Sequence, residues 1–230
     1  MALSLTGCGN GDPDRVEAER YDSFWLWAGV QPPEVLDKAR TVYVLDGEIR
    51  GNPARFAPLR PGAPRGRKQE LWLVVRTDTI AWPKGAAEGL GKRADGWGKA
   101  GNHVVGVQID FDARTKHLDD YVDFLRQLRR DLPPRYKLSI TGLMDWSANG
   151  DPRSLAKLKG TVDEVVVQTY QGRSTIWGYE AYFDRMKGFP IPFKVGLVEN
   201  GRWIEPAGLN AEPNFRGYVV FLLPRRSSTS

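Results

Sequence analysis

The residues whose types and spacing most suggest chemistry lie in the stretch HVVGVQIDFD at positions 103–112. In an extended strand side chains alternate between two faces, so Gln108, Asp110 and Asp112 share one face and Val105, Val107, Ile109 and Phe111 share the other. A strongly amphipathic helical pattern follows at once. Carboxylates at the C-terminal end of a strand that leads into a helix are where α/β barrels carry their catalytic groups. An exposed acidic turn is the alternative, but Gln108 and Asp110 lie inside the apolar run, which favours a site.

Polar and aromatic side chains also stand at the ends of other apolar runs. Carboxylates combined with rings suit carbohydrate chemistry, because one acid protonates the leaving oxygen, a second group stabilises the oxocarbenium-like centre, and rings cover the sugar faces. We therefore expect catalytic roles for Asp112, Asp110 and Glu199. We expect substrate-binding roles for Trp27, Asp46, Gln108, Asp145, Trp146, Gln168 and Tyr170. Ordinary turn chemistry is the alternative for Asp46, Asp145 and Glu199, since Asp and Asn are frequent where turns begin.

Several other kinds of site are not expected. Cys8 is the single cysteine, and His103 and His117 form no ligand spacing with each other, so we expect no metal site built on His or Cys and no cofactor. A carboxylate-bound cation at the strand ends stays open. The sequence contains no nucleophile elbow, phosphate-binding loop or dinucleotide fingerprint.

Short apolar runs alternate along the chain with helical or loop segments, which is typical of parallel β/α units. The predicted strands are Phe24 to Gly29, Val42 to Asp46, Leu71 to Thr77, Val104 to Phe111, Lys137 to Leu143, Glu164 to Tyr170, Phe193 to Val198 and Tyr218 to Leu223. Eight such strands predict an α/β fold of the (β/α)8 TIM-barrel type.

The predicted connections are uneven. Helical patterns cover residues 32–39, 84–100, 115–132 and 175–187, and a further helix starts at Asp151-Pro152. Residues 51–69 hold four prolines and no helical period, so this connection is predicted as a loop, and no final helix follows the eighth strand. We expect an incomplete or distorted barrel as one domain over residues 22–224, with a flexible tether at 1–21 and a disordered tail at 225–230.

The chain carries a net charge of +5, and its basic excess gathers in one Pro/Gly-rich segment. The residues concerned are Arg50, Arg55, Arg60, Arg65, Arg67 and Lys68. This segment is either a solvated loop or a surface for acidic glycans, lipid head groups or nucleic acid. No nucleic-acid-binding motif accompanies it, so nucleic acid is not an expected partner.

Leu5-Thr6-Gly7-Cys8 resembles the lipobox of bacterial lipoproteins, although the five residues before it are short for a signal sequence. The resemblance implies a lipid on the Cys8 sulfur that anchors the chain to a membrane on the periplasmic side of the cell envelope. Gly9 rather than Asp follows the cysteine, which by analogy with bacterial sorting favours the outer membrane. An accidental match is the alternative.

Two family resemblances follow from the strand motifs. Trp25-Leu-Trp27, Gln108-Ile-Asp-Phe-Asp112, Leu138-Ser-Ile-Thr141 and Val166-Val-Gln-Thr-Tyr170 resemble a bacterial family described as domain of unknown function 3142. More distantly, residues 105–112 are similar to the fourth-strand motif of family 18 chitinase-like glycoside hydrolases, Asp-Gly-x-Asp-x-Asp-x-Glu. That resemblance implies a general acid at Asp112, an assisting carboxylate at Asp110 and a substrate-facing phenol at Tyr170. The chain departs from the motif at Val105, Gln108 and the shorter Asp112.

Two functions follow as hypotheses. The first is a lipid-anchored glycoside-hydrolase-like barrel that acts on an envelope or extracellular polysaccharide through carboxylate general acid catalysis. The second is the same barrel as a non-catalytic carbohydrate-binding or envelope-assembly lipoprotein. Carbohydrate and, through Cys8, a membrane are the expected partners in both.

Overall fold

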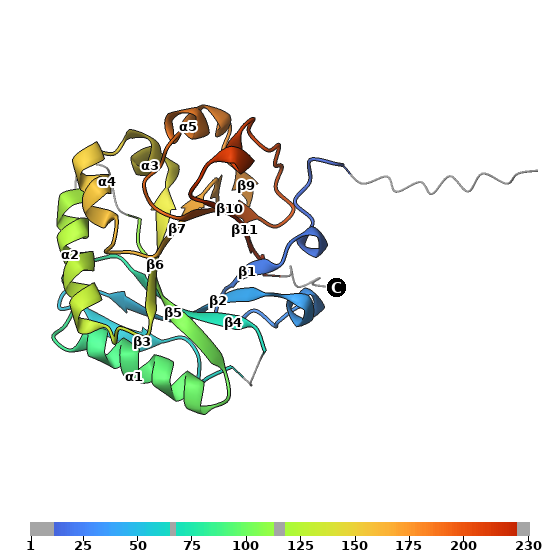
Figure 1. Cartoon of the computed structure of the whole chain (residues 1–230). Coiled ribbons are helices and arrows are strands. Elements are labelled where there is room, and N and C mark those ends of the chain that lie inside the picture. The colour runs from blue at the N-terminus through green and yellow to red at the C-terminus, as the bar shows by residue number, and fades with distance from the viewer. Residues whose placement is uncertain (1–11, 65–67, 113–117, 225–230) are drawn as a thin grey trace, which may run out of the picture.

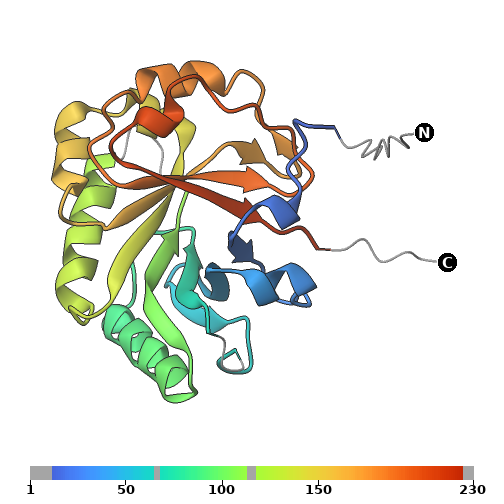
Figure 2. The same ribbon diagram turned by 45° about the vertical axis from the view of Figure 1, so that its right-hand side comes forward.

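A computed structural model describes residues 12–64, 68–112 and 118–224. Eight parallel strands form a closed barrel, because β1 pairs with both β2 and β11 (Figures 1 and 2). In spatial order the barrel strands are β1 (Ser23–Leu26), β2 (Thr41–Arg50), β4 (Glu70–Thr77), β5 (His103–Asp110), β6 (Lys137–Leu143), β7 (Glu164–Gln168), β10 (Phe193–Val198) and β11 (Phe215–Phe221). All eight correspond to predicted strands, and the distorted α/β barrel is confirmed.

Alternation along the strands creates two apolar layers. One cluster fills the barrel interior and consists of Trp25, Tyr43, Leu45, Trp72, Val74, Val166, Val219 and Phe221. The residues between them in sequence, such as Val44 and Leu73, belong to the larger cluster outside the barrel. Helical side chains such as Leu90 and Leu125 join that outer cluster. The barrel is therefore a packed core rather than a pore, as expected for a barrel of eight strands.

Helices cover one side of this barrel (Figure 1). They are α1 (Ala86–Lys99), α2 (Leu118–Asp131), α4 (Pro152–Leu158) and α5 (Glu180–Arg185), and the 3-10 helix Glu34–Lys38 follows β1. The side chain of Asp151 accepts a hydrogen bond from the backbone of Arg153, as expected for the N-cap of α4. Five predicted helices are thus present, and no helix follows β11 within the described residues.

Three short features were not predicted, namely a strand, a helix and a hairpin. Within the predicted loop 51–69, β3 (Arg55–Pro58) pairs antiparallel with β2. A short helix, α3 (Met144–Asn149), follows β6 directly. In the predicted helix 175–187, Thr175 instead belongs to a small hairpin of β8 (Tyr170–Gln171) and β9 (Ser174–Thr175), and α5 begins five residues later.

Two register irregularities change which side chains face the barrel interior. On β2, Leu45 is opposite Val74 and Gly47 is opposite Val75, so Asp46 is an extra residue in the strand. On β5, Val104 is opposite Leu71 and Gly106 is opposite Trp72, so Val105 is extra. Val105 packs against the interior cluster, and its predicted place on the outer face with Val107 is wrong.

The segment before β1 packs on the barrel from residue 12 onward. Val16 is buried, its N–H donates to Gly201 O at 2.8 Å, and its carbonyl accepts from Asn200 N at 2.9 Å. Asp14 forms an ion pair with Arg202 at 2.9 Å. The part of the predicted tether that is described therefore has fixed contacts, while Cys8 and the predicted tail 225–230 lie outside the described residues. Within the described part, none of the helices has the length and apolar character needed to cross a membrane.

Candidate active site at the C-terminal mouth of the barrel

Asp110 lies at the C-terminal end of β5 and faces the barrel interior. It is 5% exposed, and its Oδ1 accepts a hydrogen bond of 2.8 Å from Thr141 Oγ1 on β6. Its Oδ2 lies 3.7 Å from Arg76 Nε on β4. The inward direction predicted for Asp110 is confirmed by these contacts with the two neighbouring strands.

The environment of Asp110 raises the pKa of its carboxyl group. Burial raises its pKa, and this effect is larger than the opposing effects of Arg76 and of the Thr141 hydrogen bond. The negative charges of Asp112 and Glu48 raise it further. Three carboxylates and an arginine therefore share one end of the barrel.

Tyr170 belongs to the same site. Its ring lies 4.9 Å from that of Phe221, and burial raises its pKa well above the usual value. Asp110 and Asp112 raise the pKa further, while Arg76 and a hydrogen bond with Gln168 lower it. The structure therefore brings Gln168 and Tyr170 together with Asp110 and Asp112, all of them predicted site residues.

Trp27 adds an aromatic ring to this end of the barrel. Its ring centroid lies 4.5 Å from that of Trp25 and 5.7 Å from the guanidinium carbon of Arg76, a cation–π geometry. Its buried Nε1 has no hydrogen-bond partner in the described structure. Arg76 thus contacts both the predicted ring and the predicted carboxylate.

An open cavity of about 680 Å³ adjoins the site. It is lined by Arg50, Arg76, Thr77, Asp78, Thr79, Ile80, Phe111, Asp112 and Asp120. Asp112 follows the end of β5 and is exposed, so it presents a carboxylate to this cavity beside the Arg76 cation. This arrangement can offer a proton or a negative charge to a polar ligand.

Two predicted substrate-binding residues have other roles. Asp46 is fully buried outside the barrel, where its carboxylate accepts hydrogen bonds of 2.5 and 2.8 Å from Arg93 of α1. Gln108 is fully buried below the mouth, where it accepts from Trp25 Nε1 at 2.8 Å and donates to Ser139 Oγ at 3.0 Å. The hydrogen-bonding groups of Asp46 and Gln108 are thus used within the fold, which does not support substrate contact, and their binding roles stay untested predictions.

The remaining predicted residues lie elsewhere or are not described. Glu199 follows β10, and its Oε2 accepts a hydrogen bond of 2.8 Å from Leu223 N, a contact that fastens the chain after β11. Asp145 is exposed in α3 and accepts from Asn149 Nδ2 at 3.1 Å, the contact of a helical turn. The side chain of Trp146 lies outside the described part of the structure. The catalytic role of Glu199 and the binding roles of Asp145 and Trp146 stay predictions.

Three members of the site were missed as site residues. Arg76 ends β4 on the face of Trp72 and Val74, so alternation alone could have placed it inside the barrel. Thr141 could have been found in the same way from its strand. Glu48 acts on Asp110 only because the extra residue Asp46 shifts the alternation of β2, and no signal in the sequence marks that irregularity.

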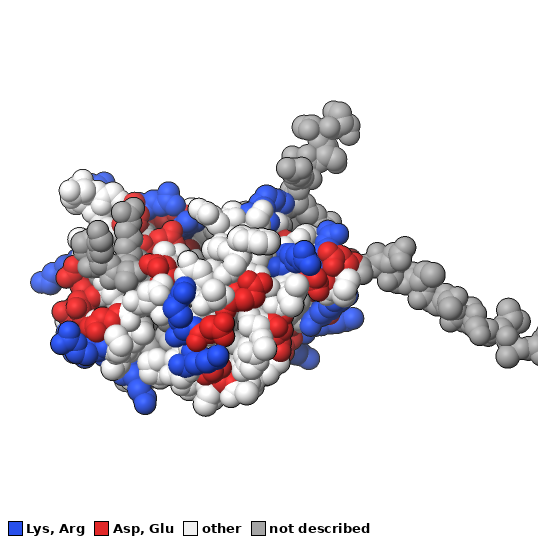
Figure 3. Space-filling model, turned by 90° about the horizontal axis from the view of Figure 1, so that it is seen from above, with Lys and Arg blue, Asp and Glu red and all other residues white. Residues whose placement is uncertain are grey.

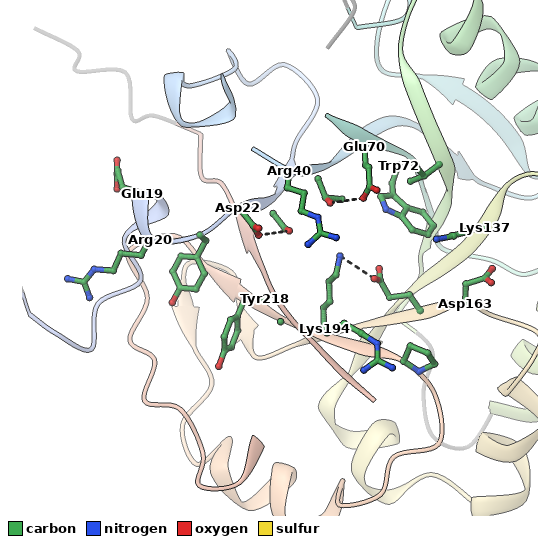
Figure 4. Close-up of a pocket in the computed structure, with 18 residues that line it drawn as sticks. Glu19, Arg20, Asp22, Arg40, Glu70, Trp72, Lys137, Asp163, Lys194 and Tyr218 are labelled. Atoms are coloured by element: carbon green, nitrogen blue, oxygen red, sulfur yellow. Dashed lines mark hydrogen bonds and ion pairs between the residues drawn. The ribbon is translucent and has the colours of Figure 1, made fainter. Parts of the chain in front are cut away.

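A larger cavity, about 890 Å³, lies at the opposite, N-terminal end of the strands (Figure 4). Glu164 and Lys194 in its floor form an ion pair of 3.2 Å, Tyr43 donates to Glu164 at 2.5 Å, and Asp163 pairs with Arg129 at 3.4 Å. These acids are engaged within the fold, and the N-terminal end of a β/α barrel usually serves stability. The C-terminal mouth is therefore the better candidate despite its smaller cavity.

Basic residues of the segment predicted as a basic loop make contacts within the barrel. Arg60 donates to the carbonyls of Leu45 and Trp27, and Arg50 pairs with Glu48 at 2.8 Å, so part of the predicted basic loop stabilises the barrel itself. Over the face in Figure 3, basic and acidic side chains are interspersed. Among the described residues, no group of three or more His, Cys, Asp or Glu side chains could hold a metal ion.

The chain is similar to one protein family. Residues 81–187, which include β5, β6 and β7, match the family described as a domain of unknown function (DUF3142). A search of the curated proteins finds no match.

Solved structures of a cortex-lytic enzyme, a chitinase domain and a chitinase-like lectin share the fold. The spore cortex-lytic enzyme SleL of Bacillus cereus is 16% identical with a TM-score of 0.50, covering 76% of this chain, and the chain spans 50% of that structure's length. The chitinase domain of the spore coat protein CotE of Clostridium difficile is 14% identical over 86% of this chain and 68% of that one, with a TM-score of 0.53. A tamarind chitinase-like lectin is 11% identical over 87% of this chain and 94% of that one, with a TM-score of 0.52. At these identities the likeness concerns the fold alone, and the chain shares the α/β-barrel fold of these structures.

Proposed function

We propose that this barrel binds a polysaccharide at its C-terminal mouth and cleaves it by carboxylate general acid catalysis. The observation that carries the proposal is the pair of Asp110 and Asp112, one buried with a raised pKa and one exposed beside an open cavity. Two carboxyl groups in unequal environments are the usual basis for separate acid and charge-stabilising roles. The names of the similar structures, which include a chitinase domain and a cortex-lytic enzyme, agree with this choice of substrate class.

In this proposal Asp112 gives its proton to the glycosidic oxygen of the leaving sugar. Asp112 is suited to this role by position, because it is exposed and lines the open cavity. Proton donation by a side chain within reach of the leaving oxygen is the step that general acid catalysis requires. As the bond between the anomeric carbon and this oxygen breaks, the carboxylate of Asp110, held by Arg76 and Thr141, faces the positive charge that develops on the sugar. Water then adds to the anomeric carbon, and the proton that it loses returns to Asp112. In this proposal the rings of Trp27 and Tyr170 contact the apolar faces of the sugar.

The test is turnover of a panel of oligosaccharides, neutral, N-acetylated and acidic, by the wild type and by Asp112→Asn. General acid catalysis contributes about 100-fold or more to a rate, so we expect Asp112→Asn to lose at least that factor. Asp123→Asn is the matched control, because Asp123 is an exposed carboxylate of α2 whose ion pair with Arg126 lies within the helix. Equal turnover by wild type and Asp112→Asn removes Asp112 from the mechanism.

A non-catalytic carbohydrate-binding barrel is the second candidate, and one observation favours it. Arg76 contacts both Asp110 and the Trp27 ring, so it occupies the space in which a sugar would meet the carboxylate. The chitinase-like lectin among the similar structures agrees with this alternative. Binding of an oligosaccharide from the panel without turnover by any variant would select it.

We infer from the lipobox-like sequence before Gly9 that the chain is anchored through Cys8 to the periplasmic side of a bacterial membrane, with the outer membrane favoured. The support is the sequence Leu5-Thr6-Gly7-Cys8 alone. Expression in a bacterium with labelled palmitate tests it, since the wild type should carry the label and Cys8→Ala should not. An unlabelled wild type contradicts the anchor and leaves the proposed activity untouched.

A further inference from the structure

Trp177 is 98% exposed, far more than any other large apolar side chain that the structure describes. The other two exposed large apolar residues are Leu59 at 39% and Ile204 at 47%. Trp is highly buried on average in folded proteins, so a ring left almost wholly in water calls for an explanation.

The backbone around Trp177 is held on both sides. On one side, Ile176 N donates to Thr169 O at 2.8 Å, and Thr175 pairs with Tyr170 in the β8–β9 hairpin. On the other side, Tyr179 is buried, with its ring stacked on that of Trp203 at 4.7 Å. The ring is therefore presented by a fixed segment, and its exposure is a feature of the fold.

The hairpin also limits the distance between Trp177 and Tyr170, the nearest residue of the proposed site along this segment. Tyr170 is the hairpin residue opposite Thr175, and its pKa is raised by the charges of Asp110 and Asp112. Trp177 is one residue beyond the one bonded to Thr169, so its Cα lies within about 10 Å of the Tyr170 Cα. A ligand that contacts both Asp112 and the Trp177 ring must therefore run past Tyr170 and along this hairpin.

We propose that Trp177 is a stacking platform for an extended glycan that enters the mouth past Tyr170. The substrate class is then a polysaccharide or long oligosaccharide rather than a disaccharide. The flat apolar face of an indole ring complements the C–H face of a pyranose, and the exposed guanidinium of Arg173 on the same hairpin can donate to sugar hydroxyls. This inference rests on the proposed function for the position of the mouth.

The experiment measures binding in the Asp112→Asn background by isothermal titration calorimetry, so that it does not depend on turnover. The probes are β-linked hexasaccharides and disaccharides of N-acetylglucosamine, glucose, xylose and galacturonic acid. Loss of one stacked ring should weaken binding of the preferred hexasaccharide about tenfold in Trp177→Ala and leave the disaccharide within about twofold. Trp177→Phe should restore most of the loss. Ile204→Ala, which removes another exposed apolar side chain, should have no effect.

Several results would overturn the inference. Equal hexasaccharide binding by Trp177→Ala and its parent, or no binding of any of the four hexasaccharides, contradicts a glycan platform. Binding of the wild type to phosphatidylethanolamine–phosphatidylglycerol vesicles that Trp177→Ala abolishes, with glycan binding unchanged, assigns the ring to a membrane surface instead. If hexasaccharide binding depends on Trp177 but no variant turns it over, the platform stands and the proposed hydrolysis fails.

Discussion

At Asp110, burial and local charge act in opposite directions. Desolvation disfavours the carboxylate, while Arg76 and the Thr141 hydroxyl favour it, and burial has the larger effect on the pKa. A buried carboxyl group with a raised pKa lowers the unfolding free energy at neutral pH, because its ionisation is easier in the unfolded chain than in the folded protein. Residues with such a conflict are concentrated at functional sites, which supports the choice of the C-terminal mouth.

This conflict predicts how stability depends on pH. The folded-state pKa of Asp110 lies above its model value of 3.8, so its contribution is complete below that value and is lost as the pH rises through the folded pKa. We expect the unfolding free energy of the wild type, relative to Asp110→Asn, to fall as the pH rises above about 4. Urea denaturation at a series of pH values from acid to neutral measures it.

The Thr141→Val variant sharpens the same measurement. It removes the hydroxyl that donates to the carboxylate of Asp110 at 2.8 Å, so burial is opposed by Arg76 alone among the groups that favour ionisation. The fall in stability with pH should then be larger than in the wild type. A difference between wild type and Asp110→Asn that is constant with pH would contradict the raised pKa.

The register irregularity of β2 places two carboxylates, those of Asp46 and Glu48, in two different environments. Because Asp46 is an extra residue, Glu48 stands opposite Arg76 and acts on the mouth, while Ile49 joins the outer apolar cluster. Asp46 itself joins β2 to α1 through the two hydrogen bonds from Arg93. One inserted residue thus supplies both a helix–strand contact and a site residue.

The Asp46–Arg93 pair should contribute strongly to stability. Arg93→Ala leaves a fully buried carboxylate without its cation, and breaking a buried pair in this way costs about 3 kcal/mol or more. Asp46→Ala should cost less, because Arg93 is 31% exposed and can be hydrated. Arg126→Ala is the matched control, since its exposed pair with Asp123 is worth about 0.5 kcal/mol or less. Chemical denaturation measures all three, and a similar loss for Arg93→Ala and Arg126→Ala would contradict the assignment.

The same elements explain what the sequence could predict. Runs such as Leu71–Val75 and the alternation around Gln108 and Asp110 reflect burial directly, so strands and inward-facing residues could be identified. The mostly exposed strand Arg55–Pro58 has no such pattern and ends in proline, so its sequence predicts a loop. Asp46 and Val105 were misplaced because register irregularities depend on the neighbouring strand, which local periodicity does not reveal.

Across the whole molecule, a chain of hydrogen bonds runs through the barrel interior below the mouth. Lys194 donates to Tyr43 at 3.0 Å, Tyr43 and Ser139 donate to Glu164, and Gln108 links Ser139 to Trp25. These residues come from six different strands, β10, β2, β7, β6, β5 and β1. A buried polar network stabilises the fold only if all of its hydrogen-bonding groups are paired at once. Loss of one member should therefore affect the others, from the N-terminal floor of the barrel to its centre.

Buried tyrosines predict how the whole fold responds to alkali. Burial raises the pKa of Tyr43, Tyr121 and Tyr170 well above 10.0 and that of Tyr218 beyond its usual range. Each contribution to stability is complete below the unfolded value near 10 and is lost as the pH rises toward the folded value. Stability should therefore fall steeply above about pH 10, by about 1.4 kcal/mol per pH unit for each such tyrosine.

Tyr43→Phe isolates one member of this group. The variant is less stable at all pH values because Glu164 loses its phenol donor, but its stability should fall less steeply above about pH 10, by about 1.4 kcal/mol per pH unit. Val44→Ala lowers stability without removing a titrating group, so it should keep the wild-type slope. Guanidinium denaturation between about pH 8 and pH 11 measures these slopes. The quantity compared is the change of unfolding free energy per pH unit, which the lower stability of the variant does not alter. An identical value for Tyr43→Phe and the wild type would show that Tyr43 ionises in the folded barrel as it does in the unfolded chain.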